Sequence, residues 1–408
     1  MRKLVRKAAL GAAALAAVAL LAAVYLAVAP ATAVPAAAAA AVTLGASPSP
    51  STSPSGSSSP SPSPSATPTP PPPLTFVRPM SPRANARNVS FAARIKIRFS
   101  AAIASDTPLP RLRPQVPGTW KIVDSTTLLF VARGHLPIYT KVSVTVPGGS
   151  RGVLAVDGAR LAKGFTVSFT VGGSSSLPRL RQLLAELNYL PLRFTVPVGG
   201  KYVSALGREA RQIDLIPLKP RSGRFRWRYH HIPSGLSAVW RSGVSTVVLR
   251  GAIMEFESDH KLAADGVAGR AVWTAVLRAA SRHAMTKRAY RYVEVSRATQ
   301  TLRVWSNGRI VYTTACNTGI ASRPTAPGTF PVYARYLSTT MSGTNPDGSH
   351  YSDPGVPWVA YFNGGDAIHG FLRPGYGWPQ SLGCVELPYS AAAVVYRYDP
   401  IGTLVAVS

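Results

Sequence analysis

The segment from Ser47 to Pro73 restricts the folding of this chain more than any other feature, because it consists almost wholly of Ser, Pro and Thr. Such a segment has few side chains that a core could bury, and it favours an extended, polyproline-like conformation. We therefore expect residues 34–73, which begin with an Ala-rich stretch, to be a linker. The 408-residue chain is long enough for two or three folded units, and these must lie beyond the linker.

The first 33 residues have the pattern of a segment that directs a chain to or across a membrane. A basic stretch, Met1 to Lys7, precedes an uncharged apolar run from Ala8 to Val28. That run is long enough to cross a bilayer as a helix with its basic flank inside, and its length favours a retained membrane anchor. Ala31-Thr32-Ala33 also fits a cleavage site, so a cleaved signal peptide stays open as the alternative. Both interpretations predict an extracytoplasmic protein, either membrane-anchored or secreted.

The formal net charge of +29 predicts an anionic partner or surface, with an ordinary solvated basic surface as the alternative. An exported chain meets anionic cell-wall polymers and the anionic membrane face. The sequence shows neither zinc-ligand spacing nor an aromatic–basic signature of nucleic-acid binding, so we expect no nucleic-acid partner.

Residues 74–175 carry short runs of alternating apolar and polar residues separated by Pro and Gly. Examples are Ile95-Lys96-Ile97-Arg98-Phe99 and Val142-Ser143-Val144-Thr145-Val146. Runs of period two at this spacing predict a small antiparallel β-sandwich. Together with Trp120 and Leu136-Pro137, they resemble the Ig-like modules of bacterial wall proteins.

Residues 176–282 change to a helical pattern, with leucines three and four residues apart from Leu177 to Leu187. A second helical stretch includes Ala252–Glu257 and Val272–Leu277, joined through Asp265-Gly266-Val267-Ala268-Gly269. The two stretches resemble the two ends of a helical peptidoglycan-binding module. Between them lies a long insertion with the basic–aromatic run Arg224–His231. That run predicts either a contact with anionic glycan or peptide, or an edge strand with a solvated basic face.

Near the C-terminus, Ile368-His369-Gly370 is followed by Ser381-Leu382-Gly383-Cys384-Val385-Glu386-Leu387. A thiol with a pKa of about 8.5 is mostly protonated at neutral pH, and a nearby imidazole can take its proton. Gly383 allows a tight turn in which backbone amides face a developing oxyanion. The pattern predicts a thiol acyltransferase, and a buried thiol beside a core histidine is the alternative.

The segment from Tyr290 to Ser408 resembles the catalytic domain of the L,D-transpeptidases that cross-link bacterial peptidoglycan. The resemblance rests on Tyr292–Val295, Gln300–Trp305, Thr318-Gly319 with Thr325–Phe330, and the His-Gly and Ser-x-Gly-Cys motifs. It implies a mainly β catalytic domain over residues 288–408. The expected fold class is thus multidomain, with that domain preceded by a small α-helical unit and an Ig-like β-sandwich.

By that resemblance, Cys384 is the nucleophile and His369 its general base. The carbonyl of Gly370 orients the imidazole, and the amides of Gly383 and Cys384 form the oxyanion hole. Ser381, Leu382, Glu386 and Tyr361 are the expected substrate-binding residues. The family usually has a second histidine at the position of Leu382 and Asn or Arg at that of Glu386, so substrate binding is expected to differ here.

The resemblance also implies a reaction. Cys384 attacks a stem peptide, the terminal D-Ala leaves, and an amine of a neighbouring stem takes the acyl group from the thioester. The implied partners are peptidoglycan stem peptides and glycan in the cell wall, and carbapenem-type inhibitors. No metal or organic cofactor is expected. Two alternatives stay open: an L,D-carboxypeptidase that hydrolyses the same thioester, and a non-catalytic wall-binding protein. Cys316, the second of the two cysteines, is expected to be a strand thiol rather than a disulfide partner of Cys384.

Overall fold

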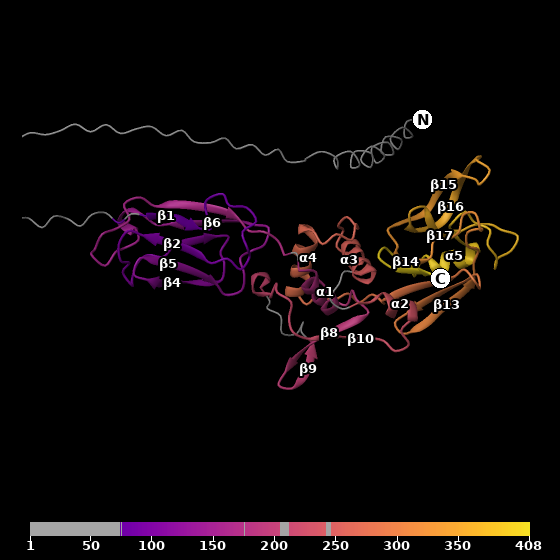
Figure 1. The fold of residues 1–408 in the computed structure, drawn as a ribbon, viewed down its shortest axis with the longest axis horizontal. Helices are drawn as coiled ribbons and strands as arrows, with labels where there is room; N and C mark the ends of the chain where they lie inside the picture. Colours follow the sequence, from indigo (N-terminus) through magenta and orange to yellow (C-terminus); the bar gives the residue numbers. More distant parts are fainter. Residues whose placement is uncertain (1–73, 75, 175, 205–211, 242–245) are drawn as a thin grey trace, which may run out of the picture. The chain divides into compact units, whose positions relative to one another are not determined.

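The computed structural model describes residues 74, 76–174, 176–204, 212–241 and 246–408 (Figure 1). The predicted targeting segment at residues 1–33 and the linker at residues 34–73 lie outside the described residues. Among the helices that are described, none is long and apolar enough to span a membrane.

The first part of the described chain consists of two antiparallel sheets that share one apolar core. Strand β2 shows why the sequence folds this way, because Ile95, Ile97 and Phe99 are buried while the residues between them are exposed. The predicted alternation is therefore present as strands. The first sheet has the order β1 (Phe76–Ser81), β2 (Ile95–Phe99), β5 (Thr127–Ala132), β4 (Gly118–Asp124), and the second β3 (Arg111–Arg113), β6 (Lys141–Val146), β7 (Phe165–Thr170).

The middle part combines helices with a small sheet. Helix α1 (Leu177–Glu186) begins at Ser176, whose hydroxyl accepts a hydrogen bond from the amide of Arg179 at 3.3 Å. The remaining elements are β8 (Leu192–Val198), β9 (Lys201–Ser204), β10 (Arg224–Trp227), α2 (Ser234–Val239), α3 (Val247–Asp259) and α4 (Arg270–Ser281). The insertion predicted within the helical unit contains an antiparallel sheet of β10, β8 and β9.

The basic–aromatic run begins with β10, which is an edge strand of this small sheet. Its aromatic residues turn inward, where Phe225 and Trp227 contact Trp240. Its arginines face outward, and the guanidinium of Arg224 stacks on Tyr202 at 3.5 Å from the ring centroid. Of the two readings of this run, the edge strand with a basic face matches the observed geometry.

The C-terminal part is mainly β, as predicted, with two sheets and one short helix. Apolar residues of both sheets, including Val293, Val304 and Ile368, share one core with α5. The first sheet has the order β13 (Arg309–Ala315), β12 (Thr301–Ser306), β11 (Arg291–Ser296), β19 (Leu404–Val407), β14 (Gly328–Pro331). The second sheet has the order β15 (Ala334–Thr344), β16 (His350–Asn363), β17 (Asp366–Gly370), β18 (Val385–Leu387), and α5 spans Tyr389–Val395.

One apolar cluster crosses the predicted boundary between the helical and C-terminal parts. Tyr292, Trp305 and Leu404 from the C-terminal sheet belong to the same cluster as residues of α1, α3 and α4. The indole nitrogen of Trp305 donates to the carbonyl of His231 at 3.0 Å. Separating the two parts would therefore expose large apolar side chains to water.

Candidate active site

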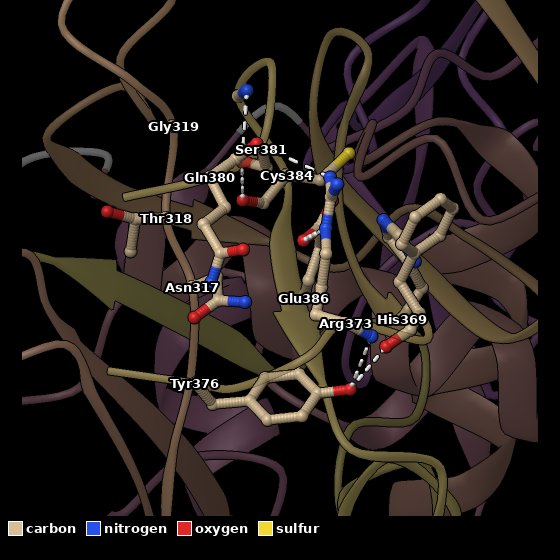
Figure 2. Close-up of polar contacts among 12 residues, drawn as sticks. Asn317, Thr318, Gly319, His369, Arg373, Tyr376, Gln380, Ser381, Cys384 and Glu386 are labelled. Carbon is tan, nitrogen blue, oxygen red and sulfur yellow. Dashed lines mark hydrogen bonds and ion pairs between the residues drawn. The ribbon is translucent and has the colours of Figure 1, made fainter. Parts of the chain in front are cut away.

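His369 and Cys384 are brought together by the parallel pairing of β17 and β18. His369 lies near the end of β17, and Cys384 directly precedes β18. The register places Ile368 opposite Val385 and His369 opposite Glu386. Figure 2 shows the two side chains beside each other. A short parallel ladder thus positions two residues that a loop separates in the sequence.

The imidazole of His369 is buried and held by one backbone contact. Its Nδ1 lies 3.0 Å from the carbonyl oxygen of Gly370. Because a carbonyl can only accept, Nδ1 carries the proton in this contact and Nε2 is left with its lone pair. Burial lowers the pKa of His369 below its ordinary value, although the Gly370 carbonyl acts in the opposite direction. The neutral ring can therefore accept a proton through Nε2.

The thiol of Cys384 is half-buried in the floor of a cavity, with Sγ 3.7 Å from the carbonyl oxygen of Gly365. Burial, above all, raises the pKa of Cys384 to about 12, and the nearby carboxylates of Asp366 and Glu386 act in the same direction. The thiol is thus protonated at neutral pH and needs a base to react. Within the described residues, no hydrogen bond joins Sγ to His369, which is common for catalytic pairs without substrate.

The loop before Cys384 is shaped by Ser381 and Gly383. The hydroxyl of Ser381 donates to the carbonyl of Cys384 at 2.6 Å and accepts from the amide of Gly383 at 3.2 Å. Ser381, expected to bind substrate, is therefore engaged with the backbone in this state. The amide of Gly383, expected to stabilise an oxyanion, has to leave Ser381 before it can do so.

The segment Asn317–Gly319 supports this loop from the opposite side (Figure 2). Asn317 and Glu386 exchange backbone hydrogen bonds of 3.0 and 2.9 Å, and Gly319 pairs with Ser381. The side chain of Asn317 also accepts from the amide of Gly377 at 3.0 Å. The nucleophile loop is thus fixed from both ends.

Gly383→Ala is expected to distort the candidate site more than Gly377→Ala. Both glycines have a positive φ, +126° and +116°, so an alanine is strained at either position. A Cβ at Gly383 would lie 2.4 Å from Oδ1 of Asp366, whereas a Cβ at Gly377 would meet no atom within 4 Å. We expect Gly383→Ala to lower the reactivity of Cys384 toward iodoacetamide and Gly377→Ala to leave it nearly unchanged. Equal loss in both variants would show that backbone strain alone is responsible.

Glu386 is held by Arg373 in a two-point ion pair. Nε and Nη2 of Arg373 each lie 2.8 Å from a carboxylate oxygen of Glu386. The side chain of Glu386 is 5% exposed and that of Arg373 is 29% exposed. Arg373 also lies over the ring of Phe371, 4.7 Å from its centroid, and Phe371 meets His369 edge-on. The acidic residue at position 386 is therefore neutralised by an arginine that sequence reasoning did not identify.

Replacing Arg373 and replacing Glu386 are expected to shift the pKa of His369 in opposite directions. Glu386 raises and Arg373 lowers that pKa, so Arg373→Met should raise it and Glu386→Gln should lower it. An NMR titration of the His369 ring nitrogens measures both shifts. Arg373→Met should also lower the free energy of unfolding by about 2–3 kcal/mol, less than for a fully buried pair because Arg373 is partly exposed. Shifts of the same sign in both variants would contradict this electrostatic account.

The thiol and imidazole face a cavity of about 660 Å³. All four expected substrate-binding residues, Tyr361, Ser381, Leu382 and Glu386, contribute to its lining. Further lining residues come from the long β15–β16 hairpin, from the turn that leads into β17 and from the loop between β17 and β18, and sequence reasoning missed them because they carry no local motif. They are Thr340, Met341, Ser342, Asn345, Tyr351, Asp353, Gly365, Asp366, Phe371, Arg373 and Gln380.

Both cysteines are free thiols. Cys316 is fully buried in the core of the C-terminal sheets, and burial raises its pKa to about 12. In the part of the chain that the structure describes, no group of three or more His, Cys, Asp or Glu side chains could hold a metal ion. The chemistry that this arrangement supports is nucleophilic attack by a thiol that a neutral imidazole deprotonates.

A thiol and a neutral imidazole at one substrate-sized cavity are the groups that acyl transfer through a cysteine requires. Residues 290–407 match the model of the YkuD family, the L,D-transpeptidase catalytic domain. The last part of the chain therefore carries a catalytic domain of the L,D-transpeptidase type.

Several solved structures that are similar to this chain are L,D-transpeptidases. One from Mycobacterium smegmatis is 12% identical and covers 83% of this chain and 100% of its own, with a TM-score of 0.27. L,D-transpeptidase 3 from Mycobacterium tuberculosis is 12% identical and covers 82% of this chain and 98% of its own, with a TM-score of 0.27. The catalytic domain from E. faecium L,D-transpeptidase is 28% identical and covers 30% of this chain and 100% of its own, with a TM-score of 0.28. No curated protein matches the chain.

Proposed function

We propose that this protein is a peptidoglycan L,D-transpeptidase that works through a cysteine thioester. The observation that carries the proposal is the pairing of β17 and β18, which places the Cys384 thiol and the proton-accepting face of His369 at one cavity. The match of residues 290–407 to the L,D-transpeptidase catalytic domain supports the substrate class.

The proposed reaction has two steps. In the first, Nε2 of His369 takes the thiol proton, and Sγ of Cys384 attacks the carbonyl carbon that precedes the terminal D-Ala of a tetrapeptide stem. The tetrahedral intermediate collapses, the C–N bond breaks, and the imidazolium returns its proton to the leaving D-Ala amine. In the second, an amine of a neighbouring stem attacks the thioester carbonyl. His369 takes a proton from that amine and gives it to the departing thiolate.

The oxyanion of each tetrahedral intermediate requires hydrogen-bond donors near Cys384. We propose the amides of Gly383 and Cys384 for this role. Donation by Gly383 requires its hydrogen bond with Ser381 to be exchanged for one with the oxyanion. Such an exchange gives Ser381 a part in shaping the loop, while Tyr361 and Leu382 are the proposed contacts to the stem from the cavity wall.

The regions upstream of the catalytic domain are proposed to hold it at the wall. We propose residues 1–33 as a membrane anchor or signal peptide and residues 34–73 as a spacer. The two sheets of residues 74–175 support an Ig-like module, and residues 176–282 are proposed as a peptidoglycan-binding unit. The protein would then act outside the cytoplasm, in the cell wall.

Incubation of the purified protein with a disaccharide-tetrapeptide, followed by mass analysis, tests the proposal. A cross-linked dimer that has lost one D-Ala is the expected product. A disaccharide-tripeptide alone would identify an L,D-carboxypeptidase, in which water resolves the thioester. If neither product forms and a carbapenem gives no adduct, the result would identify a non-catalytic wall-binding protein. The carbapenem is a suitable probe because a thiolate can open its β-lactam carbonyl, and the E. faecium catalytic domain was determined acylated by ertapenem.

A further inference from the structure

Two adjoining cavities on the middle part of the chain form a basic groove, distant in sequence from the candidate active site. One cavity, of about 570 Å³, is lined by residues of α4 and by His260 and Leu262. The other, of about 550 Å³, is lined by residues 283–288 and by residues of and near β8 and β10. Ala284 belongs to both linings, so the two cavities adjoin at this residue. The groove's defining basic residues are Arg193, Arg270, Arg278, Arg282 and Lys287.

These five side chains are exposed and lack a counter-charge. Among the described residues, their charged ends take part in no ion pair or hydrogen bond, and neither cavity is lined by Asp or Glu. Arg288, next to them, is neutralised by Asp259 at 2.8 Å. Arg228 serves the fold instead, because its guanidinium donates to the carbonyls of Leu190 and Leu192. Burial, and then the charge of Arg193, lower the pKa of Arg228 to about 10.

Helix stability does not account for the arrangement of the arginines on α4. Arg270 is the first residue of the helix, where the macrodipole disfavours a cation. Arg278 and Arg282 are four residues apart, a spacing at which like charges repel on a helix. Cations are favourable near the C-terminal end, but that benefit applies to Arg278 and Arg282 alone. The macrodipole thus leaves Arg270 unexplained, and it does not concern Arg193 and Lys287, which lie outside α4.

We propose that this groove binds a linear phosphate polymer, such as a poly(glycerol phosphate) chain of the cell envelope. Along α4 the rise from Arg270 to Arg278 is about 12 Å and from Arg278 to Arg282 about 6 Å. A chain that lies along the groove therefore meets a guanidinium at intervals of one to two helical turns. Each guanidinium can donate two parallel hydrogen bonds to one phosphate.

The lining of the groove distinguishes this ligand from other polyanions. Between the arginines, α4 presents Ala271, Ala275 and Ala279, a shallow apolar floor that suits a plain polymer backbone. Stacked bases require exposed aromatic rings, and the α4 cavity has none apart from the imidazole of His260. The adjoining cavity is lined by His283 and by Tyr229, whose ring packs edge-on against Trp305. Polyglutamate carries its carboxylates on side chains that project from the backbone, whereas the phosphates of the proposed ligand lie in the chain itself and can follow the shallow floor between the arginines.

The experiment measures binding of an end-labelled poly(glycerol phosphate) to the full chain by fluorescence anisotropy across a salt series. We compare the double variant Arg278→Gln/Arg282→Gln with a matched control, Arg151→Gln/Lys163→Gln, which removes the same charge from exposed positions elsewhere. Loss of two charge-assisted contacts should weaken binding at least about tenfold in the groove variant and flatten its salt dependence. The control should bind nearly as the unmodified protein does.

Further measurements separate a loss of binding in the groove from a loss of folding or a general effect of charge. Thermal unfolding should change little in the groove variant, because the lost helix-dipole stabilisation at Arg278 and Arg282 is offset by relief of their mutual repulsion. The reactivity of Cys384 with iodoacetamide should not change, because these side chains lie outside the catalytic domain. Equal weakening in groove and control variants would overturn the proposal and leave a general effect of net charge. Equal or tighter binding of a polyglutamate with the same number of charges would overturn the assignment of a phosphate polymer. Equal or tighter binding of an oligothymidylate would overturn the assignment of a polymer without bases.

Discussion

Cys384→Ala is expected to abolish acylation by a carbapenem and cross-linking of stem peptides, lowering both by at least about four orders of magnitude. The expectation follows from position rather than from thiol chemistry alone, since the structure contains two free thiols with similarly raised pKa values. Only Cys384 faces the cavity that also holds His369. Intact-mass analysis after exposure to ertapenem detects the adduct, and product masses measure turnover.

Cys316→Ala is the matched control. Cys316 is fully buried in the core, so its truncation should cost about 1 kcal/mol of stability, comparable to a small core deletion. Acylation should stay close to that of the unmodified protein at temperatures below unfolding. An adduct that persists in Cys384→Ala, or that disappears equally in both variants, would contradict the assignment of Cys384 as the sole nucleophile.

The candidate nucleophile and base could be predicted from the sequence because each lies in a short local motif. His369-Gly370 and Ser381–Cys384 are each contiguous, and the tight turn at Gly383 has a sequence signal in the glycine itself. The structure shows φ of +126° at that glycine. The mainly β character of the C-terminal part was predicted through the resemblance to the L,D-transpeptidase catalytic domain rather than from the pattern of its own strands.

Contacts between distant segments could not be predicted in this way. Glu386 was visible as a departure from the family pattern, but its partner Arg373 comes from a loop whose position depends on the β17–β18 register. Asp366 approaches Gly383 only through the turn before β17. The small sheet of the middle part was missed for a different reason. Strands β9 and β10 have four residues each, too few for a period-two pattern to be distinguished from a loop.

His369→Ala is expected to lower the rate of Cys384 acylation by about two to four orders of magnitude at neutral pH. The pKa of the Cys384 thiol is raised to about 12, so without a base very little thiolate forms. Below that pKa the thiolate fraction rises about tenfold for each pH unit, so the rate of the variant should recover steadily as the solution becomes more alkaline. The unmodified protein should not show this dependence near neutrality, because its imidazole already accepts the proton.

The rate of Cys384 acylation at acidic pH gives an independent check of the role of His369 as the base. Burial lowers the pKa of His369 below its ordinary value of 6.5, so the neutral ring persists to a lower pH than in an exposed histidine. Acylation by the unmodified protein should be lost only as the pH falls through this lowered pKa, and His369→Ala should lack that step. His369→Asn controls for the space left by the ring, because its amide can still donate to the Gly370 carbonyl but cannot act as a base. If His369→Asn acylated at the rate of the unmodified protein, the imidazole would position the loop rather than deprotonate the thiol.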